Sequence, residues 1–128
     1  MTEENCQQRA GSPEDIEKCT DALIAAVKQS DAYKRFEAAK EKLTHYEELR
    51  AGLDAFRKKL FTVPRQVSEE ELPHVMEELC AEQRELYSSP VIAEYITSEQ
   101  ELCFLIRRQY LRLAGIADFE IANVIDQV

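Results

Sequence analysis

The segment from Ser89 to Gly115 constrains the fold of this chain more than any other part of the sequence. Ser89 can cap a helix, Pro90 suits the first helical position, and Gly115 can adopt the left-handed conformation that ends a helix. Between them an apolar pattern repeats every three or four residues, which predicts a helix of about seven turns, about 38 Å long. A rod of this length exceeds the needs of a compact domain, so we expect part of it to contact another chain.

The apolar stripe of this helix is interrupted once, by Glu99. From the stripe we predict a protein-contact strip made of Ile92, Tyr95, Ile96, Glu99, Leu102 and Ile106. Packing inside the chain is the alternative for each of these six residues. Replacement of Ile96 by Asp distinguishes the two, because loss of an oligomer with retained helicity indicates an interface, whereas unfolding indicates core.

Four further helical patterns precede this long helix. A Ser-Pro start at Ser12 predicts a first helix that ends or restarts at Ser30, and a second stripe runs from Asp31 to Leu43. The capping-box spacing of Thr44 and Glu47 predicts a third helix through Leu60. Residues 61–67, with Pro64, are expected to form the main loop, and a fourth helix to begin near residue 72 or 73 and reach 87.

The fold class that follows is all-α, an antiparallel bundle of about five helices with one long C-terminal helix and a short helical tail. Residues 1–11 are polar and lack periodicity, so they are expected to form a disordered N-terminal tail. Residues 12–128 are then a single helical domain, which is the usual organisation for a chain of 128 residues.

The charge balance favours protein partners. Twenty-five acidic and 16 basic residues give a net charge of -9, which repels phosphates and argues against direct binding of nucleic acid. No stretch of about 18 apolar residues could span a membrane, and the N-terminus lacks the features of a secretory signal. We therefore expect a cytoplasmic protein with no membrane association.

Side chains suited to catalysis are scarce. His45 and His74 each lie beside a probable helix start without a metal-ligand neighbour, and no acid-base pair can be located from spacing, so we expect no enzyme. The four cysteines are widely spaced and are expected to remain mostly thiols in a reducing compartment. A thiol-based redox sensor or cofactor protein that uses Cys19, Cys80 and Cys103 is the alternative function, and small core side chains are the alternative role of these cysteines.

Two segments, residues 30–40 (SDAYKRFEAAK) and 89–102 (SPVIAEYITSEQEL), together resemble the YlbF/YmcA family of small bacterial regulators. The order of elements matches over residues 13–114, about four fifths of the chain. The resemblance implies an all-helical, non-enzymatic regulator that self-associates and joins related YlbF/YmcA subunits and a PSP1-domain protein. It also implies action with ribonuclease Y in RNA processing, and an influence on competence, sporulation and biofilm formation.

Some complexes of this family hold iron-sulfur clusters ligated by cysteines, sometimes from cysteine-rich C-terminal tails. This chain departs from that pattern, because its last eight residues, 121–128, contain no cysteine. No cofactor is therefore expected. A cluster remains the alternative that the resemblance implies, with Cys80 and Cys103 as its candidate ligands.

Overall fold

The computed structural model describes residues 12–117 and consists there of five α-helices without any strand. They are α2 (Pro13–Gln29), α3 (Asp31–Thr44), α4 (Glu47–Gln66), α5 (Leu72–Tyr87) and α6 (Pro90–Ile116). The all-α class and the number of helices are thus confirmed. The expected N-terminal tail and C-terminal helical tail lie outside the described residues.

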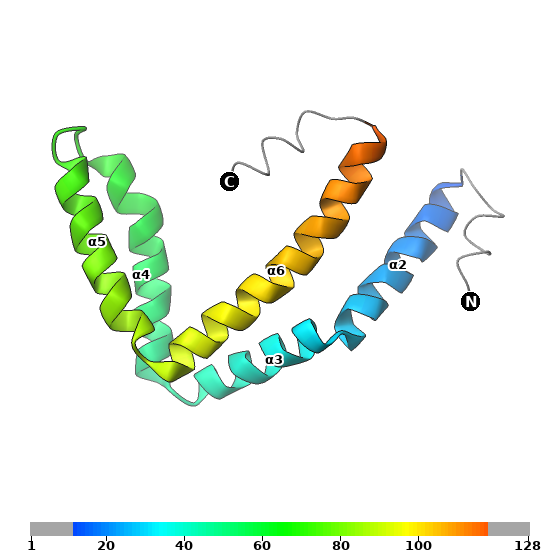
Figure 1. The fold of residues 1–128 in the computed structure, drawn as a ribbon, viewed down its shortest axis with the longest axis horizontal. Coiled ribbons are helices and arrows are strands. Elements are labelled where there is room, and N and C mark those ends of the chain that lie inside the picture. The colour runs from blue at the N-terminus through cyan, green and yellow to red at the C-terminus, as the bar shows by residue number, and fades with distance from the viewer. Residues whose placement is uncertain (1–11, 118–128) are drawn as a thin grey trace.

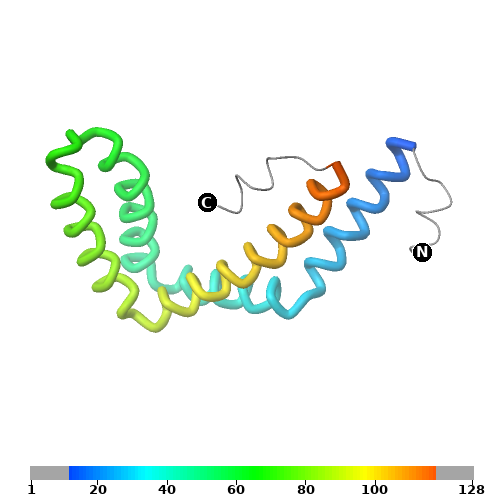
Figure 2. The backbone as a smooth tube through the Cα atoms, turned by 45° about the horizontal axis from the view of Figure 1, so that its top comes forward, coloured from blue at the N-terminus to red at the C-terminus, as the bar shows by residue number. Residues whose placement is uncertain are grey.

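The helices form two arms that meet at a vertex (Figure 1). One arm is the antiparallel hairpin of α4 and α5, linked by the ion pair of Lys59 with Glu82 at 3.1 Å. In the other arm α3 and α6 run antiparallel, as the pairs Lys42 with Glu94 and Arg35 with Glu101 show. Figure 2 shows the same separation of the hairpin from α6 after rotation, so the two arms diverge away from the vertex.

The core lies at the vertex, where α3 ends and α6 begins. Its centre is a cluster of four buried side chains from three helices, Leu43, Leu53, Ile92 and Ile96. Half-buried apolar side chains from the ends of the neighbouring helices close this cluster, among them Leu49, Leu86 and Tyr87. Each arm therefore depends on a small region of shared packing near its base.

The start of α2 and the break between α2 and α3 both agree with the serine signals in the sequence. The Ser12 hydroxyl accepts a hydrogen bond from the Asp15 amide and starts α2, as expected. Ser30 both ends α2 and caps α3, because its backbone amide donates to the Val27 carbonyl and its hydroxyl accepts from the Tyr33 amide. The chain changes direction there, since Ser30 has extended φ and ψ.

The predicted capping box at Thr44 is wrong. Thr44 is the last residue of α3, and its hydroxyl donates to the Glu41 carbonyl instead of capping the next helix. The N-cap of α4 is Tyr46, which forms no side-chain capping bond. A threonine hydroxyl can bond to the preceding turn or to the following one, and the local sequence does not decide between them.

The predicted loop at residues 61–67 is also wrong, because α4 continues to Gln66 with Pro64 inside it. Proline disrupts a helix interior by removing an amide donor, but Pro64 lies in the last turn, where few bonds follow it. Side chains support this turn: the Thr62 hydroxyl donates to the Lys58 carbonyl, and the Arg65 guanidinium donates to the Phe61 carbonyl. The connection between α4 and α5 is therefore short.

Both ends of α6 differ slightly from expectation. Ser89 is its N-cap, but the hydroxyl forms no capping bond. Gly115 lies inside the helix rather than ending it, and Ala117 at the C-cap has a φ of -101°. A glycine permits a left-handed stop without enforcing one. The predicted start of α5 at residue 72 and its end at 87 are confirmed.

Two isoleucines on α6 test whether the core lies at the vertex and the distal part of the helix lies at the surface. Ile92 is 0% exposed and Ile106 is 51% exposed. We expect Ile92→Ala to lower the free energy of unfolding by about 2–5 kcal/mol, because the vertex loses apolar contacts and retains a cavity. Ile106→Ala is the matched control, with an expected loss of about 0.5 kcal/mol or less under dilute conditions. Urea denaturation followed by circular dichroism measures both, and equal losses would contradict the assignment.

Candidate protein-interaction surface

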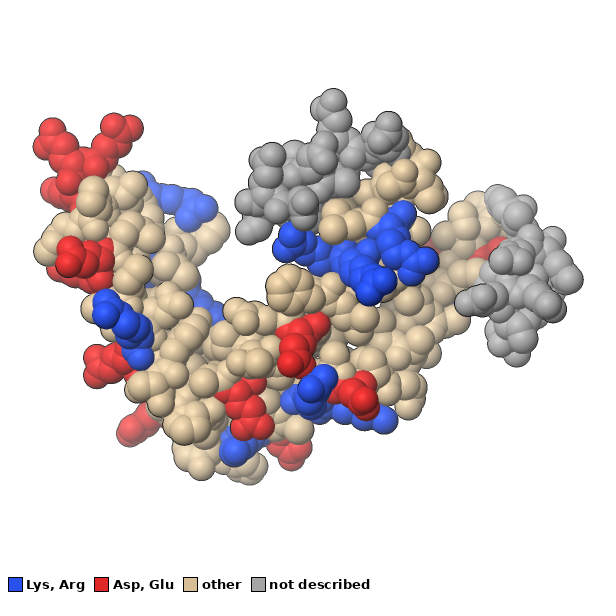
Figure 3. Space-filling view, viewed as in Figure 1, with Lys and Arg blue, Asp and Glu red and all other residues tan. Residues whose placement is uncertain are grey.

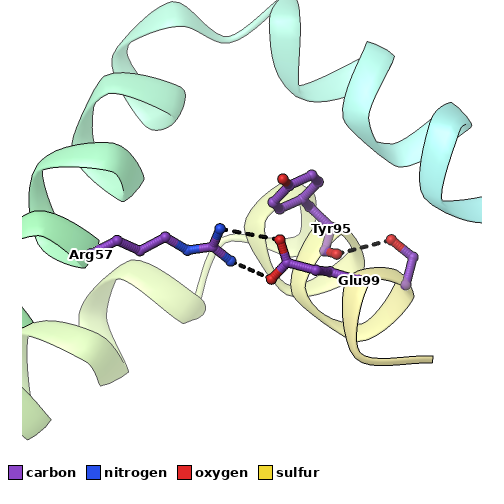
Figure 4. Close-up of polar contacts among 4 residues, drawn as sticks. Arg57, Tyr95 and Glu99 are labelled. Atoms are coloured by element: carbon purple, nitrogen blue, oxygen red, sulfur yellow. Dashed lines mark hydrogen bonds and ion pairs between the residues drawn. The ribbon is translucent and has the colours of Figure 1, made fainter. Parts of the chain in front are cut away.

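A bidentate ion pair joins the two arms beside the core. Arg57 on α4 donates from Nη1 to Oε2 of Glu99 on α6 at 3.1 Å, and from Nη2 to Oε1 at 2.5 Å (Figure 4). The two side chains are 39% and 28% exposed, so solvent partly screens the pair. Both carboxylate oxygens of Glu99 are engaged, which explains how a carboxylate is accommodated within an apolar stripe.

Tyr95 connects this ion pair to α3. The Arg57 guanidinium lies over the Tyr95 ring, 5.7 Å from its centroid, and the Phe36 ring of α3 lies 5.6 Å from it on a tilted plane. Burial raises the pKa of Tyr95 above its usual value, and the Glu99 carboxylate raises it further, whereas Arg57 lowers it. The hydrogen bonds to Glu99 raise the pKa of Arg57, so this cation persists at all ordinary pH values.

The arrangement positions helices rather than reacting groups. Arg57, Tyr95 and Glu99 come from two helices and contact a third, and none of them is a nucleophile activated by a neighbouring base. Next to them the Ser98 hydroxyl donates to the Tyr95 carbonyl at 2.9 Å and is thereby satisfied in a buried position. We refer to Arg57, Tyr95 and Glu99 as the vertex clamp.

The six residues of the predicted contact strip have different environments in the structure. Ile92, Ile96 and Leu102 are buried within the chain, which is the alternative stated for them. Tyr95 and Glu99 belong to the vertex clamp and are partly buried. Ile106 alone among the six residues is exposed and remains a candidate for contact with another protein.

Beyond Leu102 the stripe of α6 becomes exposed. Ile106, Tyr110 and Leu113 continue the same helical spacing and are 51%, 44% and 62% exposed. Helix α2 runs along this part of α6 in both ribbon views, yet none of its residues is buried (Figures 1 and 2). Its exposed apolar side chains are Ile16, Leu23 and Ile24. We call these six residues the apolar arm face.

Sequence alone does not reveal the α2 half of this face or the partner of Glu99. The spacing of Ile16, Leu23 and Ile24 was visible as a helix stripe, but periodicity does not show which element covers a stripe. The break at Glu99 signals a carboxylate that needs a cation, and several basic residues could have supplied it. Only the fold identifies Arg57.

The cysteines and histidines fall outside the vertex clamp. Cys80 on α5 and Cys103 on α6 are free and exposed, whereas Cys19 is disulfide-bonded, so the expectation of thiols is wrong for Cys19. His74 pairs with Glu78 at 2.9 Å on the surface of α5, and His45 is an exposed C-cap residue. Within residues 12–117 no three potential metal ligands of the His, Cys, Asp or Glu type come together.

These features define a class of small all-helical proteins in which a fixed vertex carries two arms with exposed apolar faces. A sequence model of the family described as control of competence regulator ComK, YlbF/YmcA, matches residues 16–110. The chain belongs to this family, and its role is therefore regulatory, in the control of competence. Comparisons with curated proteins and with solved structures found no significant match. No helix within the described residues is long and apolar enough to cross a membrane.

A double-mutant cycle tests the vertex clamp. We expect Arg57→Gln and Glu99→Gln to show a coupling free energy of about 1 kcal/mol, near the upper end for a solvent-screened pair because the geometry is bidentate. Denaturant unfolding of the two single variants and the double variant measures it. The exposed pair Lys42 and Glu94 is the matched control, with an expected coupling below about 0.5 kcal/mol. Equal coupling in the two pairs would contradict a special role for the clamp.

The Tyr95 hydroxyl provides an electrostatic test of the same geometry. In Glu99→Gln one cause of the raised pKa is removed while the lowering influence of Arg57 remains, so the Tyr95 pKa should fall. An NMR titration of tyrosine ring carbons, assigned with Tyr95→Phe, measures this shift. Glu94→Gln, on the same helix but paired with Lys42, should leave the Tyr95 pKa unchanged. A Tyr95 pKa that stays the same or rises in Glu99→Gln would show that the Glu99 carboxylate does not act on this ring.

Proposed function

We propose that this chain is a non-enzymatic regulatory adaptor that acts through helix-mediated assembly with other proteins. The observation that carries the proposal is α2, a helix of 17 residues with an apolar stripe and no buried residue. Most helical stability in proteins comes from packing an amphipathic face against a neighbour, yet the helices beside α2 bury none of its residues within residues 12–117. An interface with another protein supplies the missing burial.

Exposed apolar side chains on both arms support the same conclusion. Leu113 on α6 is 62% exposed, and Phe61 on α4 is 64% exposed. Exposed apolar surface of this kind favours a partner rather than a self-contained globule.

A second copy of this chain is the first partner that we propose for the apolar arm face. The face combines aliphatic side chains from α2 and from α6 with Tyr110, and a two-fold axis would pair it with the same face of another copy. Related YlbF/YmcA subunits could substitute for that copy. The core of such an interface is apolar, and its rim is polar.

Membership of the YlbF/YmcA family supports the finer part of the proposal. We propose that the chain joins a PSP1-domain protein and modulates ribonuclease Y-dependent RNA processing in the cytoplasm. This role would affect sporulation and biofilm formation as well as competence. The net charge of -9 favours contact with these proteins over contact with the RNA itself. No catalytic step and no bound cofactor are part of this role.

Substitutions on the apolar arm face test the assembly. We expect Ile106→Asp and Ile24→Asp each to weaken self-association at least about 10-fold, because each places a charge in the apolar part of the contact. Size-exclusion chromatography with light scattering gives the mass, and circular dichroism confirms retained helicity. Tyr46→Asp at the start of α4, an exposed position outside the apolar arm face, is the matched control.

Two results would overturn this proposal. One is a wild-type chain that stays monomeric alone and after co-expression with related subunits and a PSP1-domain protein. The other is an oligomer whose mass is unchanged in both aspartate variants. A visible absorbance trace during anaerobic purification should be flat, and a coloured protein that bleaches in Cys80→Ser or Cys103→Ser would favour the cofactor alternative.

A further inference from the structure

The distal half of α6 carries a basic surface on an otherwise acidic chain. Residues 104–116 contain Arg107, Arg108 and Arg112 and no acidic residue. Figure 3 shows these basic side chains gathered over distal α6, beside the hollow between the two arms. Phe104, 67% exposed, and Leu111 lie on the same side and line one shallow depression with the arginines. We call these five residues the arginine face.

Two of these arginines are available to a partner. Arg108 and Arg112 are exposed, and neither forms an ion pair within residues 12–117. The Arg112 guanidinium donates to the Gln109 side chain on its own helix at 3.4 Å, which leaves further donors for a carboxylate. A guanidinium group can donate two parallel hydrogen bonds to one carboxylate. Next to an exposed aromatic ring, such groups suit recognition of carboxylates on another protein surface.

The opposite charge lies at the end of the other arm. Residues 68–78 contain five glutamates and no lysine or arginine. The Ser68 hydroxyl accepts from the Glu71 amide and forms a turn, in which Glu69, Glu70 and Glu71 are all exposed. Figure 3 shows acidic side chains gathered at this end of the hairpin. We call Glu69, Glu70 and Glu71 the acidic tip.

The acidic tip also has apolar neighbours. Met76, in the second turn of α5, is 38% exposed, and Phe61 near the end of α4 is 64% exposed. Both surfaces therefore combine charges of one sign with exposed apolar side chains, and their charges are opposite. This is the complementarity that orients two proteins as they associate.

The two surfaces lie at the free ends of different arms, and the vertex separates them (Figure 1). A contact between them therefore needs two molecules. We infer that the acidic tip of one copy docks on the arginine face of a second copy, in a head-to-tail contact that differs from the apolar arm face. This inference rests on the proposed function, since it treats the chain as an assembling subunit.

A head-to-tail contact leaves one acidic tip and one arginine face unused at the two ends of each pair. Further copies can add until a ring closes or a filament grows. A nucleic acid is the less favoured occupant of the arginine face, because the rest of the chain is strongly acidic and three arginines contact few phosphates.

Charge exchange between the two surfaces tests the inference. The first variant combines Arg108→Glu with Arg112→Glu, and the second combines Glu69→Arg with Glu70→Arg, leaving Glu71 at the N-cap of α5. We expect each variant alone to weaken the head-to-tail contact at least about 10-fold, because like charges then face each other. An equal mixture of the two variants should restore the contact. The unchanged acidic tip of the first variant then meets the unchanged arginine face of the second, and the two reversed surfaces also have opposite charges.

Light scattering on the full chain at about 0.1 M and about 1 M salt gives the readout. The wild-type mass should exceed that of a dimer at the lower salt and fall to the dimer at the higher salt, where the screening length drops from about 10 Å to about 3 Å. Arg50→Glu with Arg84→Glu is the matched control for the first variant, because it changes the net charge by the same amount at exposed positions on α4 and α5. This control should behave as wild type.

Three results would overturn the inference. They are a wild-type mass that does not depend on salt, charge-reversed variants that have the wild-type mass, or an equal mixture of the two variants whose mass does not return to the wild-type value. Tight binding of single-stranded RNA that is lost in Arg108→Glu with Arg112→Glu, with an unchanged mass, would assign the arginine face to nucleic acid instead. A salt-resistant dimer that Ile106→Asp disrupts would leave the proposed function standing in each of these cases.

Discussion

The packing of Leu43, Leu53, Ile92 and Ile96 at the vertex is the interaction on which the rest of this structure depends. These side chains come from α3, α4 and α6, so one cluster sets the starting point of both arms. Apolar packing alone is non-directional and leaves the angle between helices poorly determined. The vertex clamp adds direction, because the bidentate geometry of Arg57 and Glu99 fixes the approach of α4 to α6.

A small core at the base of two long arms has a consequence for surface chemistry. Helices that diverge from a vertex cannot cover one another along their full length, so their distal stripes stay exposed. The stripe of α6 illustrates this: Ile92 and Ile96 are buried, whereas Ile106 and Leu113, with the same periodicity, are exposed. One continuous sequence pattern thus serves both the fold and, in our proposal, assembly.

The helices themselves were largely predictable, because their signals are local. Ser12, Ser30 and Pro73 mark helix ends by hydrogen bonding and by the geometry of proline, and those positions agree with the structure. Pro64 and Gly115 were misread because their local preferences were outweighed: a last turn tolerates proline, and glycine accepts helical geometry. The candidate site was less predictable, since the burial of Ile92 and the pairing of Glu99 depend on helices distant in sequence.

The distribution of polar contacts along the arms extends this argument to assembly. The salt bridges between α3 and α6 and between α4 and α5 lie on exposed surfaces and contribute little individually. The vertex clamp is more enclosed, and it fixes the angle at which the acidic tip and the arginine face are presented. When each subunit has two complementary ends held at a fixed angle, the angle decides whether successive contacts close into a ring or continue as a filament. In the head-to-tail assembly that we infer, the geometry at Arg57 and Glu99 therefore influences the form of the assembly, because the inferred contacts lie at the far ends of both arms.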